Sequence, residues 1–151
     1  EVRSLDGDFL IATRTFFTMD DVVNTPEKAL GLYKIDREQL SLIWGEGPPT
    51  SEITSHLLAY STGKGRALVH CHMDSVTALS GMIPLPEGYG WVDKMEPGSI
   101  ELANATMTAM RSNHTVIWKG HGAISLGDDP KICIERLVYL DEYLADHPGG
   151  I

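Results

Sequence analysis

Short apolar runs typical of β-strands alternate with segments of helical periodicity along the chain, and this alternation limits the possible folds more than any other feature. A Ser or Thr, or an Asp followed by Pro, stands before three of the helical segments, where such residues cap helix starts. We predict strands over 8–13, 31–36, 40–44, 67–72, 115–118 and 123–126. We predict helices over 53–62, 76–79 and 100–110 and from Pro130 onward, with a hairpin turn at 36–38. The pattern predicts a single α/β domain.

Composition and net charge limit the classes of protein to which the chain can belong. The chain has 151 residues, 42% of them hydrophobic and 22% charged, as in an ordinary soluble globular domain. A net charge of −9 argues against a nucleic-acid groove and against an anionic membrane surface as partners. We find no membrane span or signal peptide, and two distant cysteines make no disulfide framework. These features favour a cytoplasmic protein.

Three histidines carry the strongest chemical signal. His70 and His72 are two residues apart in a predicted strand, so both imidazoles lie on one face, while Cys71 points to the other face as a small hydrophobe. Such a pair also occurs by chance in chains that bind no metal. His121, in a glycine-flanked turn, can complete a three-histidine site that leaves one zinc coordination position open to substrate.

Other polar residues allow two interpretations. Glu52 is either a first-turn carboxylate that the helix dipole favours or a catalytic base beside a metal. His56 lies one turn later on the same helix face and is expected to support the site rather than ligate. We expect His114 to be a solvated surface residue. The acidic pairs at 20–21 and 128–129 are expected to act as turn or capping residues.

Four ordered motifs occur along the chain: Pro49-Thr50-Ser51-Glu52, Leu68-Val69-His70-Cys71-His72, Pro97-Gly98-Ser99-Ile100-Glu101-Leu102-Ala103 and His121-Gly122. Together they resemble the class II (zinc-dependent) aldolase/adducin family, and the resemblance covers nearly all of the chain. Within that family, 31–44 and the His-Cys-His strand are most similar to the aldolases of rhamnulose 1-phosphate, and then to those of fuculose 1-phosphate.

The resemblance implies a fold, a metal and a reaction. The fold would be a three-layer α/β/α class II aldolase-like domain with a mixed central sheet. The protein would hold one Zn²⁺ per subunit through His70, His72 and His121, form a homotetramer, and bind the phosphate of a sugar phosphate through Thr50 and Ser51. It would cleave a ketose 1-phosphate reversibly to dihydroxyacetone phosphate and an aldehyde, with Glu52 as the base that moves the proton.

The same resemblance leaves alternatives open. A sugar-phosphate epimerase or a methylthioribulose-phosphate dehydratase would share these motifs, whereas a non-catalytic adducin-like module would not need its histidines and Glu52 intact. Compared with the family, residues 1–151 are expected to lack an N-terminal segment and a C-terminal tail. Thr13-Arg14-Thr15 stands where a phosphate-binding turn is expected, and Gly120 replaces the asparagine often found before the third histidine.

Overall fold

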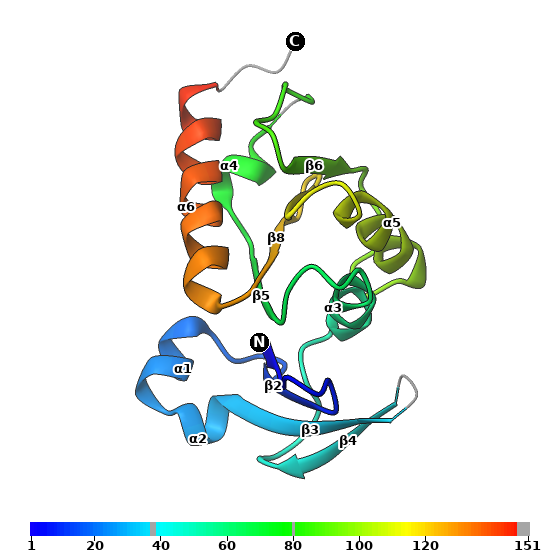
Figure 1. The fold of residues 1–151 in the computed structure, drawn as a ribbon. Helices are drawn as coiled ribbons and strands as arrows, with labels where there is room; N and C mark the ends of the chain where they lie inside the picture. Colours follow the sequence, from blue (N-terminus) through cyan, green and yellow to red (C-terminus); the bar gives the residue numbers. More distant parts are fainter. Residues whose placement is uncertain (37–38, 80, 148–151) are drawn as a thin grey trace. The chain divides into compact units, whose positions relative to one another are not determined.

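The computed structural model describes residues 1–36, 39–79 and 81–147 (Figure 1). The chain divides into two compact units, a first unit of residues 1–53 and a second unit of residues 54–151, and each is described by itself. That residues 1–151 make one domain stays a prediction.

The first unit is an antiparallel sheet with two short helices. Its strands are β1 (Val2–Arg3), β2 (Phe9–Thr13), β3 (Leu30–Asp36) and β4 (Gln39–Trp44), in the spatial order β4-β3-β2-β1. The predicted strands at 8–13, 31–36 and 40–44 are confirmed. The predicted hairpin turn includes residues 37 and 38, which lie outside the described residues.

Two helices, α1 (Met19–Asn24) and α2 (Pro26–Ala29), connect β2 to β3 and were not predicted. The signal for α1 is a capping box: the Thr18 hydroxyl accepts from the Asp21 N–H at 3.2 Å, and the Asp21 carboxylate accepts from the Thr18 N–H at 2.7 Å. The capping role expected of the 20–21 pair is therefore confirmed for Asp21.

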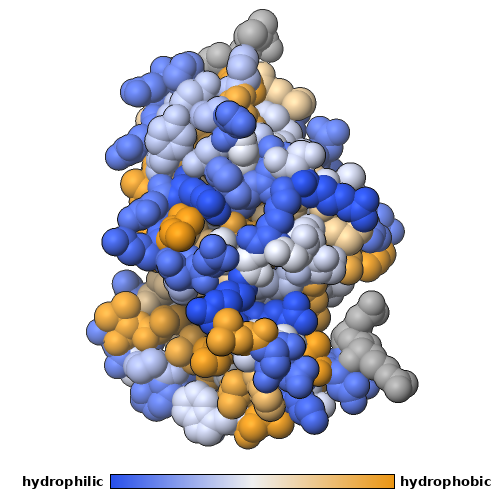
Figure 2. Space-filling model, in the orientation of Figure 1, coloured by the Kyte–Doolittle hydropathy of each residue, from blue (hydrophilic) through white to orange (hydrophobic). Residues whose placement is uncertain are grey.

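The first unit exposes several large apolar side chains, and apolar surface is visible over this part of the chain in Figure 2. Ile11 is 48% exposed and Trp44 is 52% exposed. Leu32 is the register partner of both, so the three side chains form one row across β2, β3 and β4. A contiguous apolar row of this kind is typical of surfaces that another polypeptide covers.

The second unit holds a mixed sheet of β5 (Ala67–Cys71), β6 (Tyr89–Val92), β7 (Thr115–Trp118) and β8 (Gly122–Gly127), in the order β5-β8-β7-β6. β6 is parallel to β7, and the other neighbours are antiparallel. The strand predictions around 67–72, 115–118 and 123–126 are confirmed. β6 was not predicted.

Helices cover both faces of this sheet. They are α3 (Ile53–Tyr60), whose first residue belongs to the first unit, α4 (Asp74–Thr77), α5 (Ile100–Met110) and α6 (Pro130–Asp146). On one face, α4 and α6 enclose a core of Met73, Val76, Ile83, Ile117, Ala123, Leu137, Leu140 and Leu144. On the opposite face α5 packs against β6 and β7. The predicted three-layer α/β/α arrangement with a mixed sheet is confirmed.

Among the helices that the structure describes, none is both long and apolar enough to cross a lipid bilayer.

Candidate metal centre

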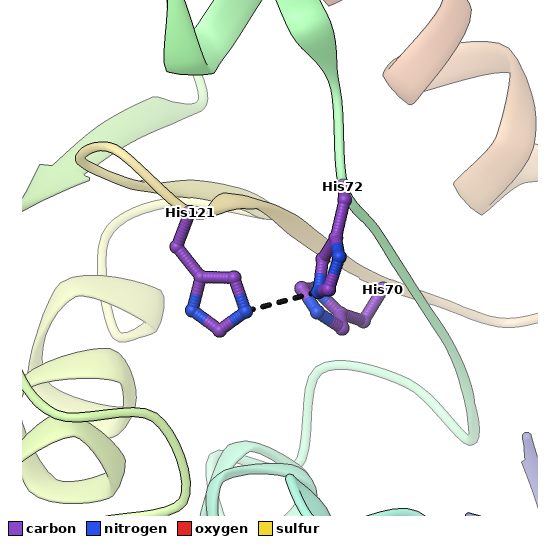
Figure 3. A group of neighbouring side chains, drawn as sticks. All are labelled: His70, His72 and His121. Atoms are coloured by element: carbon purple, nitrogen blue, oxygen red, sulfur yellow. Dashed lines mark hydrogen bonds between the residues drawn. The ribbon is translucent and has the colours of Figure 1, made fainter. Parts of the chain in front are cut away.

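His70, His72 and His121 converge in the second unit, although almost fifty residues separate the first two from the third (Figure 3). His70 lies on β5, His72 follows the end of that strand, and His121 lies in the turn between β7 and β8. Because Cys71 of β5 pairs with Ala123 of β8, the turn falls beside the end of β5. One potential ligand atom from each histidine lies within 4.8 Å of the others.

Glycines on either side of His121 make this turn possible. Gly120 has a φ of +71°, a conformation that L side chains rarely adopt. The His121 N–H donates to the Trp118 carbonyl at 3.0 Å and closes the turn. A Cβ on Gly122 would overlap the Cys71 carbonyl, so the close approach of β8 to β5 requires glycine there.

The His70 imidazole is arranged so that its Nε2 offers a lone pair. Its Nδ1 lies 2.9 Å from the Ala123 carbonyl oxygen, and a carbonyl can only accept, so Nδ1 carries the proton. Nε2 is buried and has no hydrogen-bond partner within the described part of the chain. Burial, and then the neighbouring histidine His56, lowers the pKa of His70 to about 3, which keeps the ring neutral. A neutral imidazole is the form that binds metals.

His72 and His121 face each other through their Nε2 atoms, which are 3.0 Å apart (Figure 3). Two nitrogens bound to one tetrahedral zinc would lie roughly 3.3 Å apart, given Zn–N bonds of about 2.0–2.1 Å. The His70 ring centroid is 5.0 Å from that of His72 and 5.3 Å from that of His121. The three residues therefore fit a metal ion that prefers imidazole nitrogen, such as Zn²⁺.

Cys71 lies on the other side of the strand, as predicted. It packs with Val69 against the core beneath α6, and burial raises the pKa of its thiol to about 11. A neutral thiol in apolar surroundings behaves as a small hydrophobe rather than as a metal ligand.

The other predicted site residues lie in the first unit, in the segment that leads into α3. Glu52 is buried, with 5% of its surface exposed, and its N–H donates to the Thr50 hydroxyl at 3.4 Å. The Thr50 N–H donates to the Thr13 carbonyl at 2.9 Å, and Ser51 is exposed. The roles of Glu52, Thr50 and Ser51 beside the histidines stay predictions.

His56 belongs to the second unit and lies beside the cluster. Its ring centroid is 6.2 Å from that of His70, in an edge-to-face arrangement. The group of potential ligands contains the other three histidines and not His56. The supporting role expected of His56 from the sequence stays a prediction.

Two features of the second unit were missed or misjudged from the sequence. The Trp118 ring lies against both His70 and His121 at tilted angles, yet its only sequence signal is its place three residues before His121. His114 is half-buried rather than solvated, because its ring packs edge-on against Tyr89 with 4.9 Å between centroids. Burial, and then the charges of Arg136 and Lys64, lowers the pKa of His114 to about 4.

Known proteins with similar sequences include two rhamnulose-1-phosphate aldolases. The protein of Mannheimia succiniciproducens is 27% identical over 157 residues, which cover 83% of this chain and 58% of that protein. The protein of Escherichia coli O7:K1 is 29% identical over 133 residues, which cover 68% of this chain and 48% of that protein. The chain thus spans about half the length of the curated relatives that it matches.

Solved structures share the fold. A sugar-phosphate aldolase from Thermotoga maritima superposes with a TM-score of 0.79 at 23% identity, over 91% of this chain and 69% of that one. An L-fuculose 1-phosphate aldolase gives a TM-score of 0.71 at 20% identity, over 96% and 71%. These likenesses show the class II aldolase fold.

A family model matches the chain and establishes the family that the motifs suggested. The model described as the class II aldolase and adducin N-terminal domain matches residues 2–146, almost the whole chain. The chain therefore belongs to the class II aldolase and adducin family.

Proposed function

We propose that this chain carries the metal site of an aldolase that reversibly cleaves a ketose 1-phosphate to dihydroxyacetone phosphate and an aldehyde. The observation that carries the proposal is the convergence of His70, His72 and His121, whose potential ligand atoms lie within 4.8 Å of one another. The names of the sequence relatives, which are rhamnulose-1-phosphate aldolases, support a ketose 1-phosphate as the substrate.

The proposed metal is Zn²⁺, one per subunit, held by the three imidazoles. Three neutral ligands leave the ion its full charge and one open position, so a bound zinc ion would act as a Lewis acid on the substrate ketone. The protonated Nδ1 of His70, which donates to the Ala123 carbonyl, fixes the orientation of that ring toward the ion.

We assign the proton transfer of the reaction to Glu52. In condensation, its carboxylate would remove a proton from the carbon next to the ketone of dihydroxyacetone phosphate, and in cleavage it would return the proton to that carbon. The side chain is buried, which suits a base that must act on carbon without competing water.

We assign binding of the substrate phosphate to Thr50 and Ser51, which directly precede α3. Hydroxyls and backbone N–H groups at a helix start are suited to phosphate oxygens. With a net charge of −9, the chain offers no broad attraction for an anionic substrate, so we expect phosphate binding to depend on such local donors.

The proposal is tested by loading the protein with zinc, measuring its metal content, and assaying release of dihydroxyacetone phosphate from rhamnulose 1-phosphate and fuculose 1-phosphate. We expect one zinc per chain and cleavage of at least one of the two substrates. A His121→Ala variant serves as the control and should lose both metal and cleavage. Zinc bound without cleavage of either substrate would make the aldolase proposal wrong, and turnover of a pentulose phosphate without dihydroxyacetone phosphate would favour an epimerase.

We also propose a homotetramer in the cytoplasm. The row of Ile11, Leu32 and Trp44, in which Ile11 and Trp44 are exposed, supports self-association, because apolar rows on a sheet are commonly covered by another subunit. Light scattering coupled to size-exclusion chromatography measures the state directly. A monomer at micromolar concentration would contradict this proposal without affecting the metal site.

A further inference from the structure

We propose that Trp118, held in place by Thr106, is a positioning residue for the three-histidine cluster and sets how tightly the cluster binds its metal. The inference rests on the proposed metal role of the histidines. It concerns only residues of the second unit, and none of the motifs discussed above includes Trp118 or Thr106.

Trp118 contacts two of the three histidines. Its ring centroid is 4.6 Å from that of His70, with an interplanar angle of 41°, and 5.3 Å from that of His121, with an angle of 45°. The indole is itself buried, with 1% of the residue exposed. One rigid side chain therefore forms a common wall behind two imidazoles that come from different segments.

A chain of two hydrogen bonds fixes the indole. Its Nε1–H donates to the Thr106 hydroxyl at 2.8 Å, and that hydroxyl donates to the Leu102 carbonyl at 2.7 Å. The direction is unambiguous, because an indole N–H can only donate and a carbonyl can only accept. Thr106 is fully buried, so both bonds are shielded from water.

The first turn of helix α5 anchors these two hydrogen bonds. Ser99 caps the helix by accepting from the Leu102 N–H at 3.1 Å, so the backbone of Leu102 is held one turn before Thr106. The connection runs from the capped start of α5, through Thr106 and Trp118, to the imidazole rings of His70 and His121. It thus joins helix α5, which packs on the sheet, to the proposed metal ligands.

Trp118 also acts on His121 through the backbone. Its carbonyl accepts the His121 N–H at 3.0 Å, so the same residue closes the turn and lines the imidazole that the turn presents. A displaced indole would release the ring face of His70 and His121 together. Changes to groups that orient metal ligands typically weaken metal binding about 10–100-fold.

Thr106→Val is the test, because it removes the hydroxyl with little change in volume. Thr108→Val is the matched control: Thr108 is on the same helix and its hydroxyl makes the same kind of bond, to the Asn104 carbonyl at 2.9 Å, but it is exposed. We expect the zinc dissociation constant, measured by chelator competition, to rise about 10-fold or more in Thr106→Val and less than about 3-fold in Thr108→Val.

A spectroscopic measurement tests independently whether the metal binds beside Trp118. With Trp44 and Trp91 replaced by Phe, Trp118 is the remaining tryptophan, since the chain has three. Binding of Co²⁺ should then quench its emission in proportion to metal bound, with an end point at one equivalent. This readout needs no activity, and it still applies if Thr106→Val fails to fold.

Two results would overturn the inference. Equal zinc affinity in Thr106→Val and Thr108→Val, in a protein that binds zinc, would show that the indole does not position the ligands. Unquenched Trp118 emission with Co²⁺ bound would show that the metal binds away from the indole. If the unaltered protein binds no metal at all, the proposed function fails first, which distinguishes the two failures.

Discussion

Gly120 and Gly122 show how single residues determine whether the histidines can meet. The backbone at Gly120 requires a positive φ, and the space at Gly122 excludes a Cβ. The family often has asparagine where this chain has Gly120. After glycine, asparagine is among the residues that adopt positive φ most readily, so the exchange keeps the same turn. The glycine-flanked turn could therefore be predicted from the sequence.

Glu52 is the residue whose chemistry is tested most directly by an isosteric change. Glu52→Gln removes the base but keeps the size of the buried side chain. We expect turnover to fall about 10²–10⁴-fold, because the proton on the carbon beside the ketone then has no acceptor. Zinc content should be unchanged, since the proposed metal ligands are the three histidines and not Glu52.

Measuring both the zinc content and the turnover of Glu52→Gln distinguishes the possible outcomes. Loss of zinc in this variant would instead make Glu52 mainly a ligand. Unchanged turnover with zinc bound would contradict its role as the base. Ser51→Ala is a useful companion, because it should raise the KM for the sugar phosphate without removing the base.

His114 predicts a pH dependence of stability. Its pKa is lowered to about 4 in the folded chain, so between pH 6.5 and 4 the unfolded chain binds the extra proton more readily. The free energy of unfolding should therefore fall as the pH drops through this window. Denaturant titrations of the chelator-treated protein should show part of this fall missing in His114→Gln.

His147→Gln provides the comparison for His114, because His147 is exposed. Its pH profile should follow that of the unaltered chain. An identical loss of acid sensitivity in both variants would contradict the assignment to His114.

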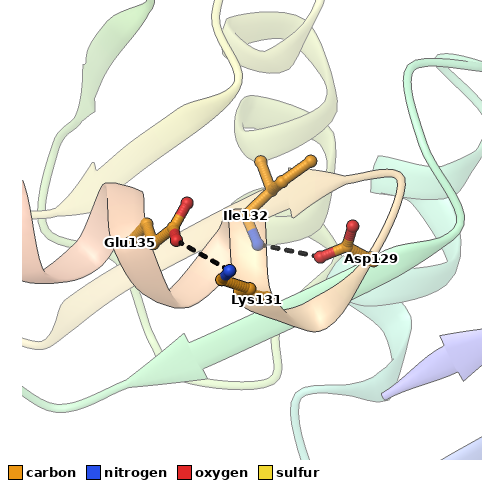
Figure 4. A network of polar contacts seen from close by, with 4 residues as sticks. All are labelled: Asp129, Lys131, Ile132 and Glu135. Carbon is orange, nitrogen blue, oxygen red and sulfur yellow. Dashed lines mark hydrogen bonds and ion pairs between the residues drawn. The ribbon is translucent and has the colours of Figure 1, made fainter.

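At the scale of elements, α6 is the helix that the sequence predicts best. The predicted Asp129-Pro130 start is confirmed, and the apolar residues that recur at helical spacing, Cys133, Leu137, Leu140 and Leu144, are all buried. At its first turn, the Asp129 carboxylate accepts the Ile132 N–H at 2.9 Å (Figure 4). The Lys131–Glu135 pair in the same view is exposed and 3.8 Å apart, so it adds little stability.

Asp129→Ala should cost about 1 kcal/mol of unfolding free energy, because the Ile132 N–H loses its capping acceptor. Denaturant unfolding measures the change. Asp128→Ala is the matched control: it removes the same charge from the adjacent exposed position without removing the cap. Equal destabilisation by both changes would attribute the effect to charge and would make the capping interpretation wrong.

The elements that sequence analysis missed are short, and their signals are weak. β6 has four residues, one of them Gly90, and gains its strand character by pairing with β7, which lies more than twenty residues later. Helices α1 and α2 have six and four residues, too short for a helical period to be recognised. A local cap fixes α1 and a distant partner fixes β6, and neither element is recognisable from its own pattern.

For the whole molecule, the features that could be predicted are those that follow from periodicity in the sequence. The features that could not be predicted arise from packing between distant segments. The alternation of strands and helices predicted the α/β class, and the pair at His70 and His72 predicted a shared strand face. The contact of Trp118 with two histidines depends on how β5, β7 and α5 pack together, and no local sequence pattern indicates it. For the same reason, the burial of His114 against Tyr89 was not predicted.

Metal binding should stabilise the folded chain as a whole, because the three ligands come together only in the folded state. At a free zinc concentration about 100 times the dissociation constant, the gain is about 2.7 kcal/mol. For a chain of this size that corresponds to a rise in Tm of roughly 5–10 °C, which differential scanning fluorimetry measures.

The specificity of this stabilisation separates a three-histidine site from general ionic effects. Mg²⁺ prefers oxygen ligands and should leave Tm unchanged at the same concentration, and EDTA should reverse the effect of zinc. His121→Ala should remove most of the zinc-induced shift while leaving the Tm of the chelator-treated protein close to that of the unaltered chain. An undiminished zinc shift in His121→Ala would place the stabilising metal elsewhere and make the three-histidine assignment wrong.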